Sequence, residues 1–293
     1  MSRRRYKRKR PLLRALGLLL LLFAALLADS NLRIVTTEYT LEYETLPSAF
    51  DGFRIVQLSD IHGAEFGAGN RRLLASVRAA EPDIIALTGD LADEDSDMAV
   101  IETLLSGLVE IAPVYYVSGN HEWHAKCLDT LQDFFDSYGV CYLRNESVLL
   151  ERGDEEIVLA GVEDPNGPKD MIAPDVFAAE LRAEYPDDFI LLLAHRNNWA
   201  EDYPTLPVDL IFCGHAHGGI VRLPVLGGLI GNDRSLFPEY VDGVHASGSY
   251  RMVISRGLGG IGSASISADG ERVFIPRFLN NPEVVAVTLR AAA

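Results

Sequence analysis

Short, uninterrupted apolar runs recur along the chain from residue 50 onward, and each stops at a polar residue. A run without alternation is typical of a strand that is covered on both faces. Helix-compatible segments lie between the early runs, over residues 70–80, 98–111 and 128–138. This alternation of runs and segments predicts a layered α/β domain. The five apolar runs span residues 53–58, 84–88, 114–117, 189–194 and 210–213.

The residues that follow these runs are carboxylates, an amide and imidazoles. In an α/β fold the carboxyl ends of the strands form the ligand crevice, so side chains at five such ends are expected to converge. Four of the chain's seven histidines are among them. Oxygen and nitrogen donors without cysteine indicate divalent transition metals at an open, catalytic site rather than a structural zinc site. The candidate metal ligands are Asp60, His62, Asp90, Asn120, His195, His215 and His217.

The order of these motifs resembles the calcineurin-like metallophosphoesterase superfamily. The motifs DxH, GDxxD, GNHE, a histidine after a strand, and GHAH follow one another between residues 60 and 217. The resemblance covers the chain from Phe53 to its C-terminus and implies a four-layer αββα sandwich. It also implies two divalent ions, Mn, Fe or Zn, that share Asp90. One ion would be held by Asp60, His62, Asp90 and His217, and the other by Asp90, Asn120, His195 and His215.

The C-terminal part resembles the bacterial membrane-anchored branch of that superfamily, whose members act on phosphodiesters or on lipid-linked pyrophosphates, as the UDP-diacylglucosamine hydrolases do. Ile220 departs from the branch pattern, because many relatives place Gln after GHxHGG. Two ions about 3.5–4 Å apart would activate a bridging hydroxide, so no side-chain nucleophile is required. His121 is predicted as the catalytic residue that stabilises or protonates the phosphoryl group; the alternative is that it only orients a ligand.

The N-terminus carries a membrane-targeting signal. Residues 15–28 are uncharged and apolar, and they follow eight basic residues that all precede Asp29. The stretch is shorter than the ~20 residues of a membrane span unless Arg14 snorkels and residues 11–13 extend it. A signal anchor is favoured over a cleavable signal peptide, which would release a secreted protein. Because the basic flank stays in the cytoplasm, the catalytic domain is predicted to be extracytoplasmic.

Composition bounds the organisation of the chain and its partners. Residues 1–30 form the basic flank and membrane segment, 31–50 a connection, and 51–293 one catalytic domain, since no linker or repeat divides it. Without the eight N-terminal basic residues, 18 Lys and Arg face 42 Asp and Glu, a formal balance of −24. Such a body repels phosphate backbones, so stable nucleic-acid binding is not expected. The three cysteines form no paired framework, although a Cys127–Cys141 disulfide stays open.

Three functions fit these patterns. The leading hypothesis is a phosphoesterase that hydrolyses phosphodiester or pyrophosphate bonds of a lipid or cell-envelope substrate, because a short tether holds the site near the bilayer. The second is a broad-specificity extracytoplasmic nucleotide phosphodiesterase or nuclease. The third is a metal-binding scaffold without catalysis, against which the complete ligand set and His121 argue. The sequence leaves open the substrate, the physiological metals and the oligomeric state.

Overall fold

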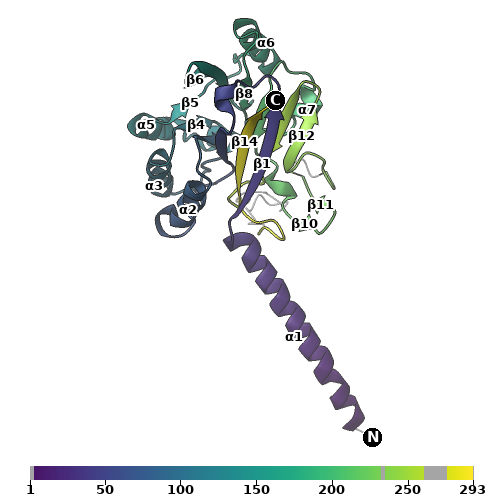
Figure 1. Ribbon diagram of the computed structural model, residues 1–293. Coiled ribbons are helices and arrows are strands. Elements are labelled where there is room, and N and C mark those ends of the chain that lie inside the picture. Colours follow the sequence, from purple (N-terminus) through teal and green to yellow (C-terminus); the bar gives the residue numbers. More distant parts are fainter. Residues whose placement is uncertain (1–2, 232–234, 261–275, 293) are drawn as a thin grey trace.

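The computed structural model describes residues 3–231, 235–260 and 276–292. Two six-stranded sheets pack face to face, and helices cover their outer faces (Figure 1). The predicted four-layer αββα sandwich is confirmed. A single long helix, α1 (Arg3–Leu32), projects away from this body.

The first sheet has the strand order β1-β14-β2-β3-β4-β5. Strands β2, β3 and β4 are parallel, so their carboxyl ends lie at the same edge. Helices α2 (Arg71–Ala79), α3 (Met98–Val109) and α5 (Leu128–Tyr138) cover the outer face, close to their predicted ranges. The strands are β1 (Val35–Tyr43), β2 (Arg54–Leu58), β3 (Ile84–Thr88), β4 (Val114–Val117), β5 (Cys141–Tyr142) and β14 (Glu283–Ala291).

The second sheet has the strand order β12-β13-β9-β8-β7-β6. Strands β7, β8, β9 and β13 are parallel, and helices α6 (Pro174–Glu184) and α7 (Trp199–Asp202) cover its outer face. The strands are β6 (Glu146–Arg152), β7 (Glu155–Gly161), β8 (Ile190–Leu193), β9 (Leu210–Cys213), β12 (Gly243–Ser247) and β13 (Tyr250–Ile254). The smaller elements are helix α4 (Asn120–Ala125), the 3-10 helices Ser48–Phe50, Ala68–Asn70 and His217–Gly219, and the hairpin strands β10 (Arg222–Leu223) and β11 (Gly227–Gly228).

Neighbouring residues of one strand serve different cores, which explains the unbroken apolar runs. In β2, Ile55 packs between the two sheets while Val56 packs under the helices of the first sheet. In β8, Leu191 lies between the sheets and Leu192 lies under the helices of the second. Since both faces of these two strands are covered, their positions are mostly apolar until the strand ends, and the polar Gln57 of β2 is buried with its amide group hydrogen-bonded.

The sandwich begins earlier in the chain than the sequence indicates. Residues 35–43, within the expected connection 31–50, form edge strand β1, which pairs in parallel with β14 along nine residues. Its burial alternates as expected for a strand with one solvent-facing side. All three cysteines carry free thiols, and Cys213 is buried.

Helix α1 contains a stretch that is long and apolar enough to cross a membrane, Pro11–Leu32, with 22 residues and a mean hydropathy of 2.3. The end of the helix is hydrogen-bonded to the body. Asn31 donates to the Arg277 carbonyl at 2.8 Å and accepts from the Arg277 amide at 3.1 Å, and the Ser30 hydroxyl accepts from the Leu279 amide at 2.8 Å. These bonds fix the direction in which α1 leaves the sandwich.

Candidate metal centre

The turns that follow five strands meet at one edge of the sandwich and bring together side chains from both sheets. All seven ligands proposed from the sequence lie there. The segment after β2 supplies Asp60 and His62, β3 leads to Asp90, β4 to Asn120 at the start of α4, β8 to His195, and β9 to His215 and His217.

Four of these residues form the first group. Asp60, His62, Asp90 and His217 each offer a donor atom within 4.8 Å of the others. His217 Nε2 lies 3.5 Å from Asp60 Oδ1, and His62 Nε2 lies 3.8 Å from Asp90 Oδ2. Within the described residues, both ring nitrogens of His62 are buried without a hydrogen-bond partner. Buried polar atoms without partners are costly, so this donor set fits a cation.

A second group again includes Asp90, with His195 and His215. His195 Nδ1 donates to the Thr88 carbonyl at 2.9 Å, which turns Nε2 toward the group. That Nε2 lies 3.2 Å from Asp90 Oδ2, from Asn120 Oδ1 and from His215 Nδ1. The two groups therefore meet at Asp90, whose two oxygens can serve two ions.

Charges inside the centre are mutually dependent. Burial raises the pKa of Asp90, but the interactions with the neighbouring histidines, of which that with His195 is the largest, together outweigh burial and hold the pKa well below its usual range. Burial lowers the pKa of His195, but the neighbouring carboxylates, of which Asp90 has the largest effect, together outweigh burial and raise the pKa to about 10. Burial lowers the pKa of His217 well below its usual range, which keeps its imidazole neutral and able to bind a metal.

Five of the seven residues adopt the left-handed backbone region that favours glycine. Residues other than glycine have a strained backbone in this region, and strained residues are found more often at functional sites. The turns are also packed too tightly for larger residues: a Cβ at Gly89 would lie 2.6 Å from His195 Nδ1 and 2.7 Å from the Cα of Gly119. The left-handed residues are Asp60 (φ 52°), His62 (φ 49°), Asp90 (φ 51°), His215 (φ 67°) and His217 (φ 48°).

Glu122 supports the turn that carries Asp90. Its carboxylate accepts hydrogen bonds from the amides of Asp90 at 3.1 Å, Ala92 at 3.1 Å and Gly119 at 2.8 Å. Burial, together with the charge of Asp90, raises its pKa to about 7. The GNHE motif contains this glutamate, but two of the three amides that it binds lie about 30 residues away, so the sequence alone does not reveal its role.

His121 lies beside both groups. Its amide donates to Asp90 Oδ1 at 2.9 Å, and its ring meets the His62 ring edge-on at 4.7 Å between centroids. A donor atom of His121 also lies within 4.8 Å of donors on His62 and Asp93. Burial lowers the pKa of His121, so its imidazole is neutral near pH 7 and retains one N–H to donate.

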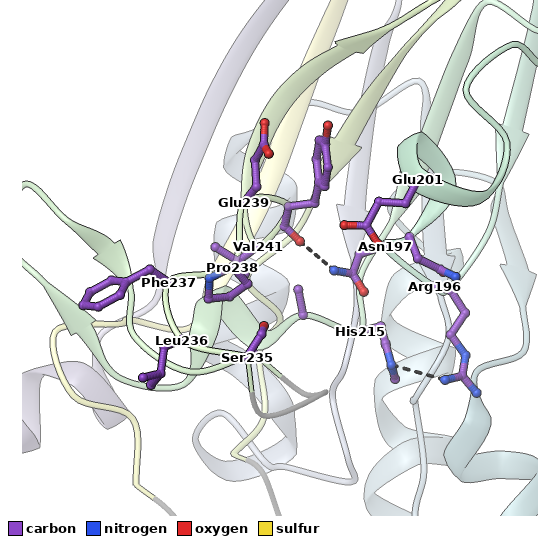
Figure 2. Close-up of a pocket in the computed structure, with 14 residues that line it drawn as sticks. Arg196, Asn197, Glu201, His215, Ser235, Leu236, Phe237, Pro238, Glu239 and Val241 are labelled. Atoms are coloured by element: carbon purple, nitrogen blue, oxygen red, sulfur yellow. Dashed lines mark hydrogen bonds between the residues drawn. The ribbon is translucent and has the colours of Figure 1, made fainter.

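Arg196, which was not predicted as a site residue, connects the centre to a cavity of about 490 Å³ (Figure 2). Its guanidinium donates to both oxygens of Asp164, at 2.7 and 3.1 Å, and its Nη1 lies 3.3 Å from His215 Nε2. Arg196 and His215 line one end of the cavity, and Leu236 and Phe237 line another part of it. The only sequence signal for Arg196 is its place directly after His195.

A sequence profile described as calcineurin-like phosphoesterase matches residues 53–219. The chain belongs to the calcineurin-like phosphoesterase family. This family of phosphoester hydrolases uses divalent metals, and this chain has residues positioned for a metal site.

Among the relatives of this phosphoesterase is the Bacillus subtilis metallophosphoesterase YkuE, 26% identical over 265 residues, which cover 88% of this chain and 86% of YkuE. The Escherichia coli phosphodiesterase YaeI is 29% identical, with 71% of this chain and 76% of YaeI covered. A Danio rerio transmembrane protein with a metallophosphoesterase domain is 29% identical over 60% of this chain and 43% of that protein.

Proposed function

We propose that this phosphoesterase binds two divalent ions and hydrolyses phosphodiester or pyrophosphate bonds of a lipid or cell-envelope substrate. The observation that carries the proposal is the meeting of two donor groups at Asp90. In this assignment one ion takes Asp60, His62, Asp90 and His217, and the other takes Asp90, Asn120, His195 and His215. The ions would supply an activated water and neutralise charge on the phosphoryl oxygens.

The residues around the ligands bind the phosphoryl group or hold the ligands in position. His121 donates its N–H to a phosphoryl oxygen or to the leaving oxygen, since it lies beside both donor groups without being required by either. Glu122 keeps the Asp90 turn in place through three amide bonds. Thr88 fixes the ring orientation of His195. These supporting hydrogen bonds matter because a ligand that is held in the wrong position weakens metal binding.

The bond class and the location rest on separate observations. The relative YaeI carries the name phosphodiesterase, which supports a diester substrate. Helix α1 supports anchoring of the chain in a membrane, and the transmembrane relative from Danio rerio agrees with this. The basic residues before the apolar stretch favour a cytoplasmic N-terminus, which leaves the sandwich on the outer side.

The proposal is tested with the full chain, purified in detergent, stripped of metal and reloaded with Mn, Fe(II) or Zn. Hydrolysis of bis-p-nitrophenyl phosphate, p-nitrophenyl phosphate and a lipid-linked pyrophosphate is then measured. Activity on the diester or the pyrophosphate that requires metal supports the proposal. Equal activity of metal-free and loaded protein, or hydrolysis of the monoester alone, contradicts it.

A further inference from the structure

Exposed apolar side chains gather beside the cavity rather than scattering over the body. Outside α1, six large apolar residues are exposed among the described residues, and four of them lie between residues 225 and 237. Scattered exposed apolar residues need no explanation, whereas a cluster points to an interaction surface. This cluster, here called the apolar rim, consists of Val225 (104% exposed), Leu226 (63%), Leu236 (69%) and Phe237 (51%).

Backbone bonds hold the parts of the rim together. Val225 and Leu226 form the tip of the β10–β11 hairpin, between Leu223 and Gly227. Beyond β11, Ile230 pairs with Leu236, and the Phe237 amide donates to the Leu229 carbonyl at 3.0 Å. The two halves of the rim therefore belong to one connected loop structure.

The same hairpin lies next to the candidate membrane helix. Val221 pairs with Phe278, and the Arg222 amide donates to the Phe278 carbonyl at 3.0 Å. The ring of Phe278 stacks on the ring of Phe23 in α1, with centroids 5.2 Å apart. Contacts thus run without a break from α1 through Phe278 to the hairpin that carries the rim.

The position of Phe23 sets the depth of this contact. Phe23 lies five residues before Ala28, the last residue of the apolar stretch, which is roughly 7 Å along the helix axis. Apolar groups that bind at a membrane interface enter it by about 5–10 Å. If α1 crosses the bilayer, Phe278 of the body already lies at that depth, and the neighbouring hairpin reaches the membrane surface.

We infer that the apolar rim inserts into the extracytoplasmic interface of the membrane that α1 crosses. Insertion beside α1 would open the 490 Å³ cavity toward lipid headgroups. The inference rests on the proposed anchoring by α1 and narrows the proposed substrate to a membrane lipid phosphoester. Leu236 and Phe237 belong both to the rim and to the cavity wall, and the cavity reaches His215 of the metal centre. A headgroup can enter there while its acyl chains stay in the bilayer. In Figure 2, Phe237 points away from His215 and Arg196.

The insertion is tested by fluorescence quenching. Full-length Leu226→Trp is reconstituted into vesicles whose lipids carry brominated acyl chains, and the emission of the wild type, with Trp123 and Trp199, is subtracted. The control is Val176→Trp, 46% exposed on α6 at the end of the body far from α1 (Figure 1). We expect the emission from residue 226 to be quenched at least about twofold more than that from residue 176, because only the rim reaches the acyl chains.

Two results contradict the inference in different ways. Chains that float with the vesicles but show equal quenching at the two positions would overturn rim insertion alone. Chains that do not float with the vesicles would overturn the anchoring, and the inference with it. Neither result bears on hydrolysis by the metal centre, so the phosphoesterase proposal is judged separately.

A second test concerns the substrate. In the Val225→Asp/Leu226→Asp variant, hydrolysis of soluble bis-p-nitrophenyl phosphate should stay within about twofold, while hydrolysis of a phospholipid diester in vesicles should fall roughly tenfold, because charged tips do not enter the interface. Equal loss on both substrates would contradict the role of the rim. A wild type that cleaves the soluble diester but no vesicle phospholipid would refute the lipid substrate, while the quenching result would still decide insertion.

Discussion

The two sheets of the sandwich contribute different donors to the metal centre. The first sheet supplies three oxygen donors and one imidazole, from Asp60, Asp90, Asn120 and His62. The second sheet supplies imidazoles only, from His195, His215 and His217. In the proposed assignment each ion takes ligands from both sheets, and the bridge belongs to the first sheet alone.

This difference gives the sheets unequal roles. In the proposed assignment, a change at the bridge would affect both ions, whereas a change at an imidazole of the second sheet would affect one. The sheets are also joined by direct bonds, since the His215 amide donates to Asp60 Oδ1 at 3.0 Å and the Gln57 amide group donates to the Cys213 carbonyl at 2.8 Å. The ions would add to these connections.

The largest effect is expected for the bridge. Asp90→Asn removes a charge that two cations share, so turnover of bis-p-nitrophenyl phosphate should fall by on the order of 10⁴-fold, as loss of several kcal/mol of charge stabilisation implies. His217→Ala should cost less, roughly 10²–10³-fold, because the second ion keeps its ligands. Steady-state kinetics in saturating metal measures both. Equal losses would contradict the asymmetry between the sheets.

A change at His121 distinguishes an effect on the catalytic step from an effect on metal binding. We expect His121→Ala to lower kcat by roughly 10²-fold or more while the metal content per chain stays that of the wild type, because in the proposed assignment the imidazole acts on the phosphoryl group and binds neither ion. His124→Ala, three residues on and with a side chain 77% exposed, is the matched control and should be silent. Loss of metal in His121→Ala would make His121 a ligand instead.

A change at Glu122 tests how far its hydrogen bonds support the turn that carries the bridging Asp90. Gln offers one acceptor oxygen where the carboxylate accepts three amide bonds, so Glu122→Gln should weaken metal affinity about 10–100-fold. At saturating metal, kcat should recover to near the wild-type value. The readout is the metal dependence of the rate, and a kcat that stays low at every metal concentration would count against a purely supporting role.

The smallest effect is expected on global stability. Ions that bind only the folded chain stabilise it by about 2.7 kcal/mol at a free concentration 100 times the dissociation constant. At about 2–4 °C per kcal/mol, chelation should lower Tm by roughly 5–10 °C. Differential scanning calorimetry in detergent with and without EDTA measures this, and an unchanged Tm would show that the ions do not join the sheets.

The fold and the converging site could largely be predicted because both leave the same mark in the sequence. A strand covered on both faces reads as an apolar run, and the first polar residue after it lies at the functional edge, as β3 and Asp90 show. The edge strand β1 escaped prediction because its alternating polar residues look like a connection and its partner β14 lies near the other end of the chain.

The supporting residues could not be predicted for a different reason. Glu122 acts on amides of Asp90 and Ala92, and Arg196 pairs with Asp164, so each role depends on contacts between segments about 30 residues apart. A histidine or aspartate directly after an apolar run can be recognised as a metal ligand from its residue type and position. The role of Glu122 or Arg196 depends instead on the groups that the fold places around it.

The central claim is that two ions share Asp90, and metal content per chain tests it most directly. The full-length wild type and Asp90→Asn are loaded with Mn, freed of unbound metal and measured by mass spectrometry of the metal against protein concentration. We predict two ions per wild-type chain and fewer than one in Asp90→Asn. One ion in the wild type, or two ions retained by Asp90→Asn, would contradict the account.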